Sequence, residues 1–188
     1  MVRIRPVAPG DEAALGLLHV RTWRAAYRGQ IPQDYLDSLD PADRERQWRQ
    51  WIREIRPPAA QLLLEHESEG PIGFVAVAPS PEATGAPADP PVGEVHALYV
   101  LPEHWGTGAG RLLMAAGMRS LRAAGCTTMT LWVLATNERA RRFYEKAGWR
   151  PDGTTKIDHY FGIPLHEVRY RYDDATAGGP RAAPPGSG

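Results

Sequence analysis

Hydrophobic and polar positions repeat with two different spacings along the chain, and these spacings predict strands and helices in a mixed order. Short runs rich in apolar and β-branched residues predict strands at residues 2–8, 61–66, 72–78, 94–100, 127–134, 149–157 and 165–172. Apolar positions three and four apart predict helices at about 11–27, 32–39, 41–55 and 137–147, and one more that begins at the glycines near 110. Asp11 is expected to cap the first of these helices, and Gly148 to stop the last.

This order of elements, one strand, two or three helices, three strands, then helix, strand, helix and two strands, predicts an α/β or mixed α+β fold. Helices are expected on both faces of one central mixed sheet of about seven strands. We expect a single domain over residues 1–174, with an exposed loop at the proline-rich stretch 79–91. Residues 175–188, rich in glycine and proline, are expected to form a disordered tail.

Composition excludes several classes of partner. Lysine plus arginine and aspartate plus glutamate number 22 each, so the formal net charge is zero. This balance gives no reason to expect a nucleic acid or an anionic membrane as a partner. The one cysteine, Cys126, is expected to be a small buried thiol, and no metal is expected. Because no apolar run approaches the ~18 residues of a membrane span and the N-terminus lacks a signal-peptide core, we expect a cytoplasmic protein.

The most informative local motif joins a strand to a helix through a glycine loop. Glycines at 106, 108 and 110 let the backbone approach an anion, and the first amides of the following helix are free to bind phosphate oxygens. Taken alone, the three glycines are also compatible with a flexible loop that binds nothing. A dinucleotide fingerprint is disfavoured, because it requires an early βαβ unit and an acidic residue after the second strand.

Together with the downstream helix, the loop resembles the GNAT superfamily of acetyl-CoA-dependent N-acetyltransferases. The matching elements are Trp105-Gly-Thr-Gly108-Ala-Gly110, Asn137, and Phe143-Tyr144-Glu-Lys-Ala-Gly148-Trp149. Trp105 departs from the family pattern, which has Gln or Arg at that position, but the backbone amides are unaffected. The resemblance covers about residues 2–173 and implies a GNAT-like, mostly antiparallel sheet with acetyl-CoA as co-substrate.

The resemblance also implies how acetyl-CoA would be held. Strands 94–100 and 127–134 would splay apart, so that unpaired backbone groups bind the pantetheine arm, while the glycine loop binds the pyrophosphate. The residues implied in cofactor binding are Leu98, Tyr99, Val100, Trp105, Gly106, Thr107, Gly108, Ala109, Gly110, Arg111 and Asn137. Asn137 can equally be a helix N-cap, and the two roles are compatible.

Acetyl transfer to an amine needs a base to deprotonate the ammonium and an acid to protonate the leaving thiolate. Glu94 matches the family's glutamate base, and His96 leaves the same face of the strand and can take or share that role. Tyr144 matches the family's acid. The competing interpretations are a solvated Glu94, a structural His96 and a core Tyr144 with a hydrogen-bonded hydroxyl.

In GNAT-like folds the first helices and the last strands form the acceptor pocket. Here that implies a site near Asp34 built from Trp23, Tyr27, Tyr35, His159 and Tyr160. Aromatic rings beside a carboxylate suit a small cationic amine, although an aromatic pair four residues apart is often core. A small-molecule primary amine is therefore the first expectation. A protein or peptide amine, or an acyl-CoA sensor without turnover, are the alternatives, and the protein is expected to be a monomer or a homodimer.

Overall fold

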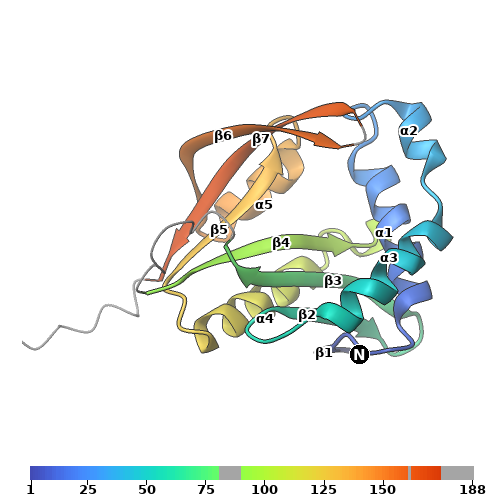
Figure 1. Cartoon of the computed structure of the whole chain (residues 1–188), viewed down its shortest axis with the longest axis horizontal. Helices are drawn as coiled ribbons and strands as arrows, with labels where there is room; N and C mark the ends of the chain where they lie inside the picture. The colour runs from blue at the N-terminus through green and yellow to red at the C-terminus, as the bar shows by residue number, and fades with distance from the viewer. Residues whose placement is uncertain (81–89, 161, 175–188) are drawn as a thin grey trace, which may run out of the picture.

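The computed structural model describes residues 1–80, 90–160 and 162–174 of the chain. Most of the expected loop at 79–91 and the expected tail at 175–188 lie outside the described residues. Described helices and strands follow the order predicted from the sequence (Figure 1). No helix in this part of the chain is long and apolar enough to cross a membrane.

Seven strands and five α-helices make up the described fold. The strands are β1 Val2–Pro6, β2 Ala60–His66, β3 Gly70–Pro79, β4 Val92–Val100, β5 Thr128–Leu134, β6 Arg150–Tyr160 and β7 Ile163–Asp173. The helices are α1 Glu12–Ala26, α2 Gln33–Ser38, α3 Pro41–Glu54, α4 Ala109–Ala123 and α5 Glu138–Lys146, with a short 3₁₀ turn at Pro102–His104.

All seven strands belong to one sheet in the order β1-β2-β3-β4-β5-β7-β6. Every neighbouring pair is antiparallel except β4 and β5, which are parallel. The predicted fold class, a mixed and mostly antiparallel sheet with helices on both faces, is therefore confirmed. The single parallel pair follows from the chain path, because a crossover through α4 returns the chain to the same end of the sheet.

Helices cover the sheet from both sides. On one face α4 packs on β2, β3 and β4, so closely that an added Cβ at Gly117 would lie 3.0 Å from Val77. On the other face α1 and α3 pack together over β3, and an added Cβ at Gly16 would lie 2.7 Å from a backbone oxygen of α3. Trp48 of α3 is 1% exposed and belongs to the hydrophobic core. Glycines at these two contacts thus let the helices approach their neighbours.

Two local expectations had different outcomes. Asp11 stands at the N-cap position of α1, but its side chain makes no capping hydrogen bond. Its two oxygens instead accept hydrogen bonds from the Arg5 guanidinium at 2.7 Å each, so the expected side-chain cap is wrong. The Cys126 thiol is buried, as expected, and burial raises its pKa.

Candidate active site

A bulge in β4 marks the point where the sheet opens. Ala76 pairs with Ala97, whereas the next residue of β3, Val77, pairs with Val95, so His96 is an extra residue in β4. Pairing between β4 and β5 ends at the same level, with Val95 opposite Leu131. Bulges redirect strands and are frequent beside active sites. Beyond this point the two strands diverge (Figure 1), and a cleft of about 1160 Å³ lies between them.

The register of β4 decides which backbone groups face the cleft. Because the Leu101 amide donates to the Ile72 carbonyl, alternation along the ladder turns the backbone of Tyr99 toward β3. The backbone groups of Leu98 and Val100 therefore point into the cleft. The Val100 carbonyl accepts a hydrogen bond of 2.8 Å from the Trp105 indole. Tyr99 reaches the cleft with its side chain rather than its backbone.

The glycine loop that follows β4 presents a row of free amides to the cleft. Gly106 and Gly108 have φ angles of +79° and +97°, in the left-handed region that favours glycine. Within the described chain, the amides of residues 106–111 find no acceptor. Gly110 serves another purpose, since an added Cβ there would lie 3.3 Å from the ring of Phe143. The helix N-terminus and its loop can thus bind an anion such as a pyrophosphate.

The ring of Trp105 makes a cation–π contact with Arg139, which the sequence analysis did not predict. The Arg139 guanidinium of α5 lies 4.1 Å from the centroid of the Trp105 ring, and both side chains line the cleft. Arg111 also lines the cleft, with Nη2 3.8 Å from the position of an added Cβ at Gly108. Where the family has Gln or Arg, an arginine from another helix is therefore held on the tryptophan face. Only the fold brings residues 105 and 139 together, so the sequence offered no signal.

Asn137 and Gly148 fix the two ends of α5. The Asn137 carboxamide accepts a hydrogen bond of 3.1 Å from the Ala140 amide, so this residue is an N-cap, and it also lines the cleft. At the other end Gly148 has a φ of +89°, and the amide of Trp149 donates to the carbonyl of Tyr144 at 3.0 Å. This is a Schellman motif, and it confirms that Gly148 stops the helix.

Glu94 and His96 form a close pair at the root of the cleft. The Nδ1 atom of His96 lies 3.1 Å from one Glu94 carboxylate oxygen, and the Ser80 hydroxyl donates to the other at 3.1 Å. Glu94 is 6% exposed, so the interpretation as a solvated strand residue is wrong. Burial raises the pKa of its carboxyl, but the bonds and charge of His96, the Ser80 hydroxyl and the Lys156 charge together lower it. Glu94 is thus an ionised carboxylate with an imidazole beside it.

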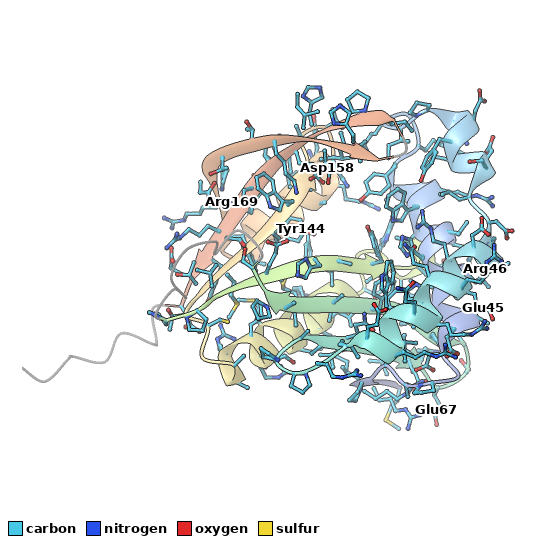
Figure 2. All side chains as sticks on the ribbon, viewed as in Figure 1. Glu45, Arg46, Glu67, Tyr144, Asp158 and Arg169 are labelled. Atoms are coloured by element: carbon cyan, nitrogen blue, oxygen red, sulfur yellow. The ribbon has the colours of Figure 1, made fainter. Side chains whose placement is uncertain are left out.

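Tyr144 lies on the opposite wall of the cleft, where α5 faces β4 (Figure 2). It is 9% exposed, and burial together with the nearby Tyr99 phenol raises its pKa well above the ordinary value. The side chain of Tyr27 hydrogen-bonds that of Tyr99, which brings a third phenol to the same region. Because its pKa is raised, Tyr144 keeps its proton throughout the neutral range.

The lining of the cleft includes four charged or aromatic residues that the sequence analysis did not single out. The Lys156 ammonium lies 4.4 Å from the centroid of the Trp132 ring and 3.4 Å from a carboxylate oxygen of Glu167. Asp158 lies 4.0 Å from the same ammonium. Burial raises the pKa of the Glu167 carboxyl. Trp132 lies on β5, Lys156 and Asp158 lie on β6, and Glu167 lies on β7, so only the pairing of these three strands shows that the residues meet.

The expected acceptor residues are only partly brought together. Trp23 and Tyr27 line the cleft, with their rings 5.0 Å apart. Tyr35 packs instead against the buried cluster around Leu36 and Val20, and His159 is exposed on β6, so neither lines the cleft. The side chain of Tyr160 lies outside the described residues.

A parallel strand pair that opens at a bulge, followed by a glycine loop and a helix N-terminus, defines a class of acyl-transfer enzyme. The sequence model of the Acetyltransferase (GNAT) family matches residues 20–149, more than half of the chain. The chain therefore belongs to this family and is an acetyltransferase, as the resemblance implied.

Individual relatives agree with this assignment. The uncharacterized N-acetyltransferase YuaI of Bacillus subtilis (strain 168) is 30% identical over 179 residues, which cover 94% of this chain and 96% of that protein. A mycothiol acetyltransferase of Nocardiopsis dassonvillei is 33% identical over 149 residues, 79% of this chain but 42% of that protein. The crystal structure of PaiA N-acetyltransferase from Thermoplasma acidophilum, in complex with coenzyme A, superposes with a TM-score of 0.66. It shares 17% identity and covers 92% of this chain and 99% of its own, so it shows the fold.

Proposed function

We propose that this protein transfers the acetyl group of acetyl-CoA directly to a primary amine of a small molecule. The observation that carries the proposal is the arrangement around the open strand pair. An ionised carboxylate paired with an imidazole, Glu94 with His96, lies at the root of the cleft, and a protonated phenol, Tyr144, lies on its opposite wall. These are the base and the acid that acyl transfer to an amine requires.

The cleft offers acetyl-CoA a matching set of groups. The amides of residues 106–111 suit the pyrophosphate, and Arg111 and Arg139 add positive charge beside them. The backbone groups of Leu98 and the amide of Val100, which face the cleft, suit the amides of the pantetheine arm, while the Val100 carbonyl already accepts the Trp105 indole. The coenzyme A bound to the PaiA N-acetyltransferase supports this assignment, since the two folds superpose.

Each proton then has a place to go. Glu94, with His96 beside it, accepts the proton of the acceptor's ammonium group, and the neutral nitrogen attacks the thioester carbon. A carbon–nitrogen bond forms, the carbon–sulfur bond breaks, and the Tyr144 hydroxyl protonates the leaving sulfur. The nitrogen still carries one proton more than the amide product, and the loss of this second proton restores the Tyr144 hydroxyl. The lost ammonium proton returns to solvent from the Glu94 and His96 pair after the product leaves.

Direct transfer is favoured over a thioester intermediate on the enzyme. The chain has one cysteine, Cys126, which is 3% exposed and does not line the cleft. The burial that raises its thiol pKa also makes it a poor nucleophile. No other thiol is available to take the acetyl group from coenzyme A.

A small-molecule acceptor is favoured over a peptide. The name of the mycothiol acetyltransferase relatives refers to a small-molecule substrate, although this chain spans less than half of the one described above. A sensor that binds acyl-CoA without turnover would need the amides of the loop, but would not need the Glu94, His96 and Tyr144 arrangement. That arrangement therefore favours the enzyme.

The proposal is tested by following thiol release from acetyl-CoA against a panel of small primary amines and peptides, with Glu94→Gln and Tyr144→Phe in parallel. We expect turnover on small amines that falls at least about tenfold in each variant. Turnover on peptides alone would overturn the substrate class, and tight binding of acetyl-CoA without turnover on any acceptor would support the sensor instead.

A further inference from the structure

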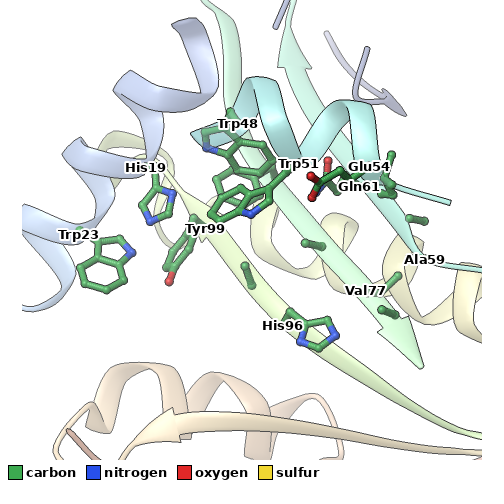
Figure 3. A pocket seen from close by; sticks show the side chains of 16 residues that line it. His19, Trp23, Trp48, Trp51, Glu54, Ala59, Gln61, Val77, His96 and Tyr99 are labelled. Atoms are coloured by element: carbon green, nitrogen blue, oxygen red, sulfur yellow. The ribbon is translucent and has the colours of Figure 1, made fainter. Parts of the chain in front are cut away.

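A second cavity, of about 430 Å³, adjoins the cleft on the face of the sheet that α1 and α3 cover. The two spaces share Trp23, His96, Ala97 and Tyr99. The second cavity therefore opens beside His96, which together with Glu94 is the proposed general base. Figure 3 shows His96 at one end and the rings of His19, Trp48 and Trp51 around the space. Its volume falls in the range of small-molecule binding sites.

The cavity exists because two small residues are paired on neighbouring strands of the sheet. Ala76 of β3 pairs with Ala97 of β4, and both line the floor. The large rings of α3 do not fill the space above these alanines, because contacts with other rings fix their positions. Trp48 and Trp51 meet edge to face with centroids 5.1 Å apart, and Trp48 contacts Phe74 in the same way at 4.8 Å. An aromatic wall over an alanine floor leaves a space that suits a flat apolar group.

The polar groups of the wall carry a clear charge preference. Among its described lining residues there is no lysine or arginine, and the charged group at its rim is Glu54. Arg44 lies 5.7 Å over the Trp23 ring and does not line the cavity. Burial, with the charge of Arg44, lowers the pKa of His19 to about 3, so that wall residue is neutral. A cationic or neutral ligand is therefore favoured, and an anionic one is disfavoured.

The wall also contains polar atoms without partners. Both ring nitrogens of His19 and the indole nitrogen of Trp48 are buried and have no hydrogen-bond partner in the described part of the chain. Buried polar atoms of this kind are uncommon, because each one costs free energy. Because these nitrogens have no accessible surface, they lie behind the wall of the cavity, and the wall presents rings rather than polar atoms to a ligand.

We propose that this cavity binds the body of the acceptor, and that the acceptor is a primary arylalkylamine that carries no carboxylate. The inference rests on the proposed function, because it assigns the substrate class of the same reaction. With its ring between Trp48, Trp51 and the alanine floor, such a molecule extends its amine past Ala97 toward His96 and Glu94. An aromatic amino acid would bring its carboxylate to the same place, beside an ionised Glu94. The lining of this cavity supplies no lysine or arginine for it, and Lys156 of the adjoining cleft already lies within 4.0 Å of the carboxylates of Asp158 and Glu167.

Binding and turnover are measured separately, so that the two proposals can fail independently. Calorimetry on the full chain saturated with coenzyme A compares 2-phenylethylamine with phenylalanine, which differs from it by the carboxylate. Thiol release from acetyl-CoA is then followed with both compounds. We expect 2-phenylethylamine to bind and to be acetylated, and phenylalanine to bind at least about tenfold more weakly.

Two variants place the ligand in the cavity. Ala76→Leu fills the floor without touching the cleft, since Ala76 lines only the second cavity. It should weaken 2-phenylethylamine binding by about tenfold or more and leave coenzyme A affinity unchanged. Trp51→Ala removes part of the wall at a partly exposed position, and should weaken the amine several-fold even if the first variant folds poorly. Ala123→Leu, an exposed site on α4, is the matched control and should behave as wild type.

Each result decides one of the two proposals. Equal binding of phenylalanine and 2-phenylethylamine, or amine binding that both cavity variants leave unchanged, overturns the assigned substrate class. Turnover on other small amines without binding of 2-phenylethylamine also overturns it, while the proposed acetyl transfer stands. Binding of 2-phenylethylamine that both cavity variants weaken, without thiol release on any amine, overturns the proposed function and leaves the cavity as a binding site.

Discussion

Replacing Gly108 by alanine separates the two effects that this glycine has on the protein. Its φ of +97° is unfavourable for any residue with a Cβ, by about 1–2 kcal/mol. A less flexible unfolded chain returns about 0.4–1 kcal/mol of that loss. Gly10 has a φ of +104° and open space around it, and it does not line the cleft. Both Gly108→Ala and Gly10→Ala should therefore lower the free energy of unfolding by about 1 kcal/mol.

The two variants should differ in their affinity for acetyl-CoA. Gly108 lines the cleft beside the free amides of residues 106–111, so an added methyl group takes space next to any bound pyrophosphate. Loss of one or two hydrogen bonds to a charged group costs about 1.5–3 kcal/mol each. Since about 1.4 kcal/mol is a factor of ten in a binding constant, Gly108→Ala should weaken acetyl-CoA binding about 10–100-fold or more. Gly10→Ala should leave it unchanged.

Urea unfolding gives the first quantity, and calorimetric titration with acetyl-CoA gives the second. The opposite result would be that Gly108→Ala binds acetyl-CoA as tightly as Gly10→Ala while both variants lose the expected stability. In that case the amides of the loop would not hold the pyrophosphate.

Three further variants test the site and the core. Glu94→Gln should lower kcat/KM for the amine about 100-fold, measured by thiol release. Because the pKa of Glu94 is lowered in the folded state, its ionised carboxylate stabilises the protein at pH values above the unfolded pKa. This contribution to the free energy of unfolding is lost as the pH falls through the folded pKa. Urea unfolding at several pH values should show the loss in wild type but not in Glu94→Gln. Tyr144→Phe should lower kcat about 10–100-fold with little change in acetyl-CoA affinity, as steady-state kinetics and calorimetry would show. Trp149→Ala, at a position 1% exposed and outside the cleft, should cost about 3–5 kcal/mol of unfolding free energy in urea titrations.

Different results would count against each of these. Full activity in Glu94→Gln would move the base to His96 alone, and an unchanged kcat in Tyr144→Phe would make that phenol a core residue. A loss below about 1 kcal/mol in Trp149→Ala would mean that the Schellman turn and its buried indole are not anchored as described.

The sequence predicted the elements because their signals are local. Alternation and helical spacing, together with turn formers such as Gly148, are properties of neighbouring residues, and the strands and helices agree with them within a few positions. Asp11 shows the limit of local reasoning. Asp11 does lie at the start of a helix, as predicted. Its carboxylate, however, accepts hydrogen bonds from Arg5 on the preceding strand instead of capping the helix.

What the sequence did not reveal depends on register and packing. The bulge at His96 shifts the pairing register of β3 and β4 by one residue, and no pattern in residues 94–100 predicts it. The stack of Arg139 on Trp105, the Lys156 and Glu167 pair, and the Ala76 and Ala97 floor all join segments that are distant in sequence. The residues taken from the family pattern, by contrast, fall mostly around one cleft, because that pattern follows a single strand, loop and helix.

Transfer of an isotopically labelled acetyl group shows whether the enzyme moves acetyl from coenzyme A directly to an amine. The full chain is mixed with 2-phenylethylamine or another small primary amine and acetyl-CoA that carries ¹³C in its acetyl group, and both protein and small molecules are analysed by mass spectrometry. We expect label on the amine nitrogen in step with free thiol, and none on the protein. Thiol release that leaves every amine unlabelled, or label that gathers on the protein, would contradict direct transfer in the cleft between β4 and β5.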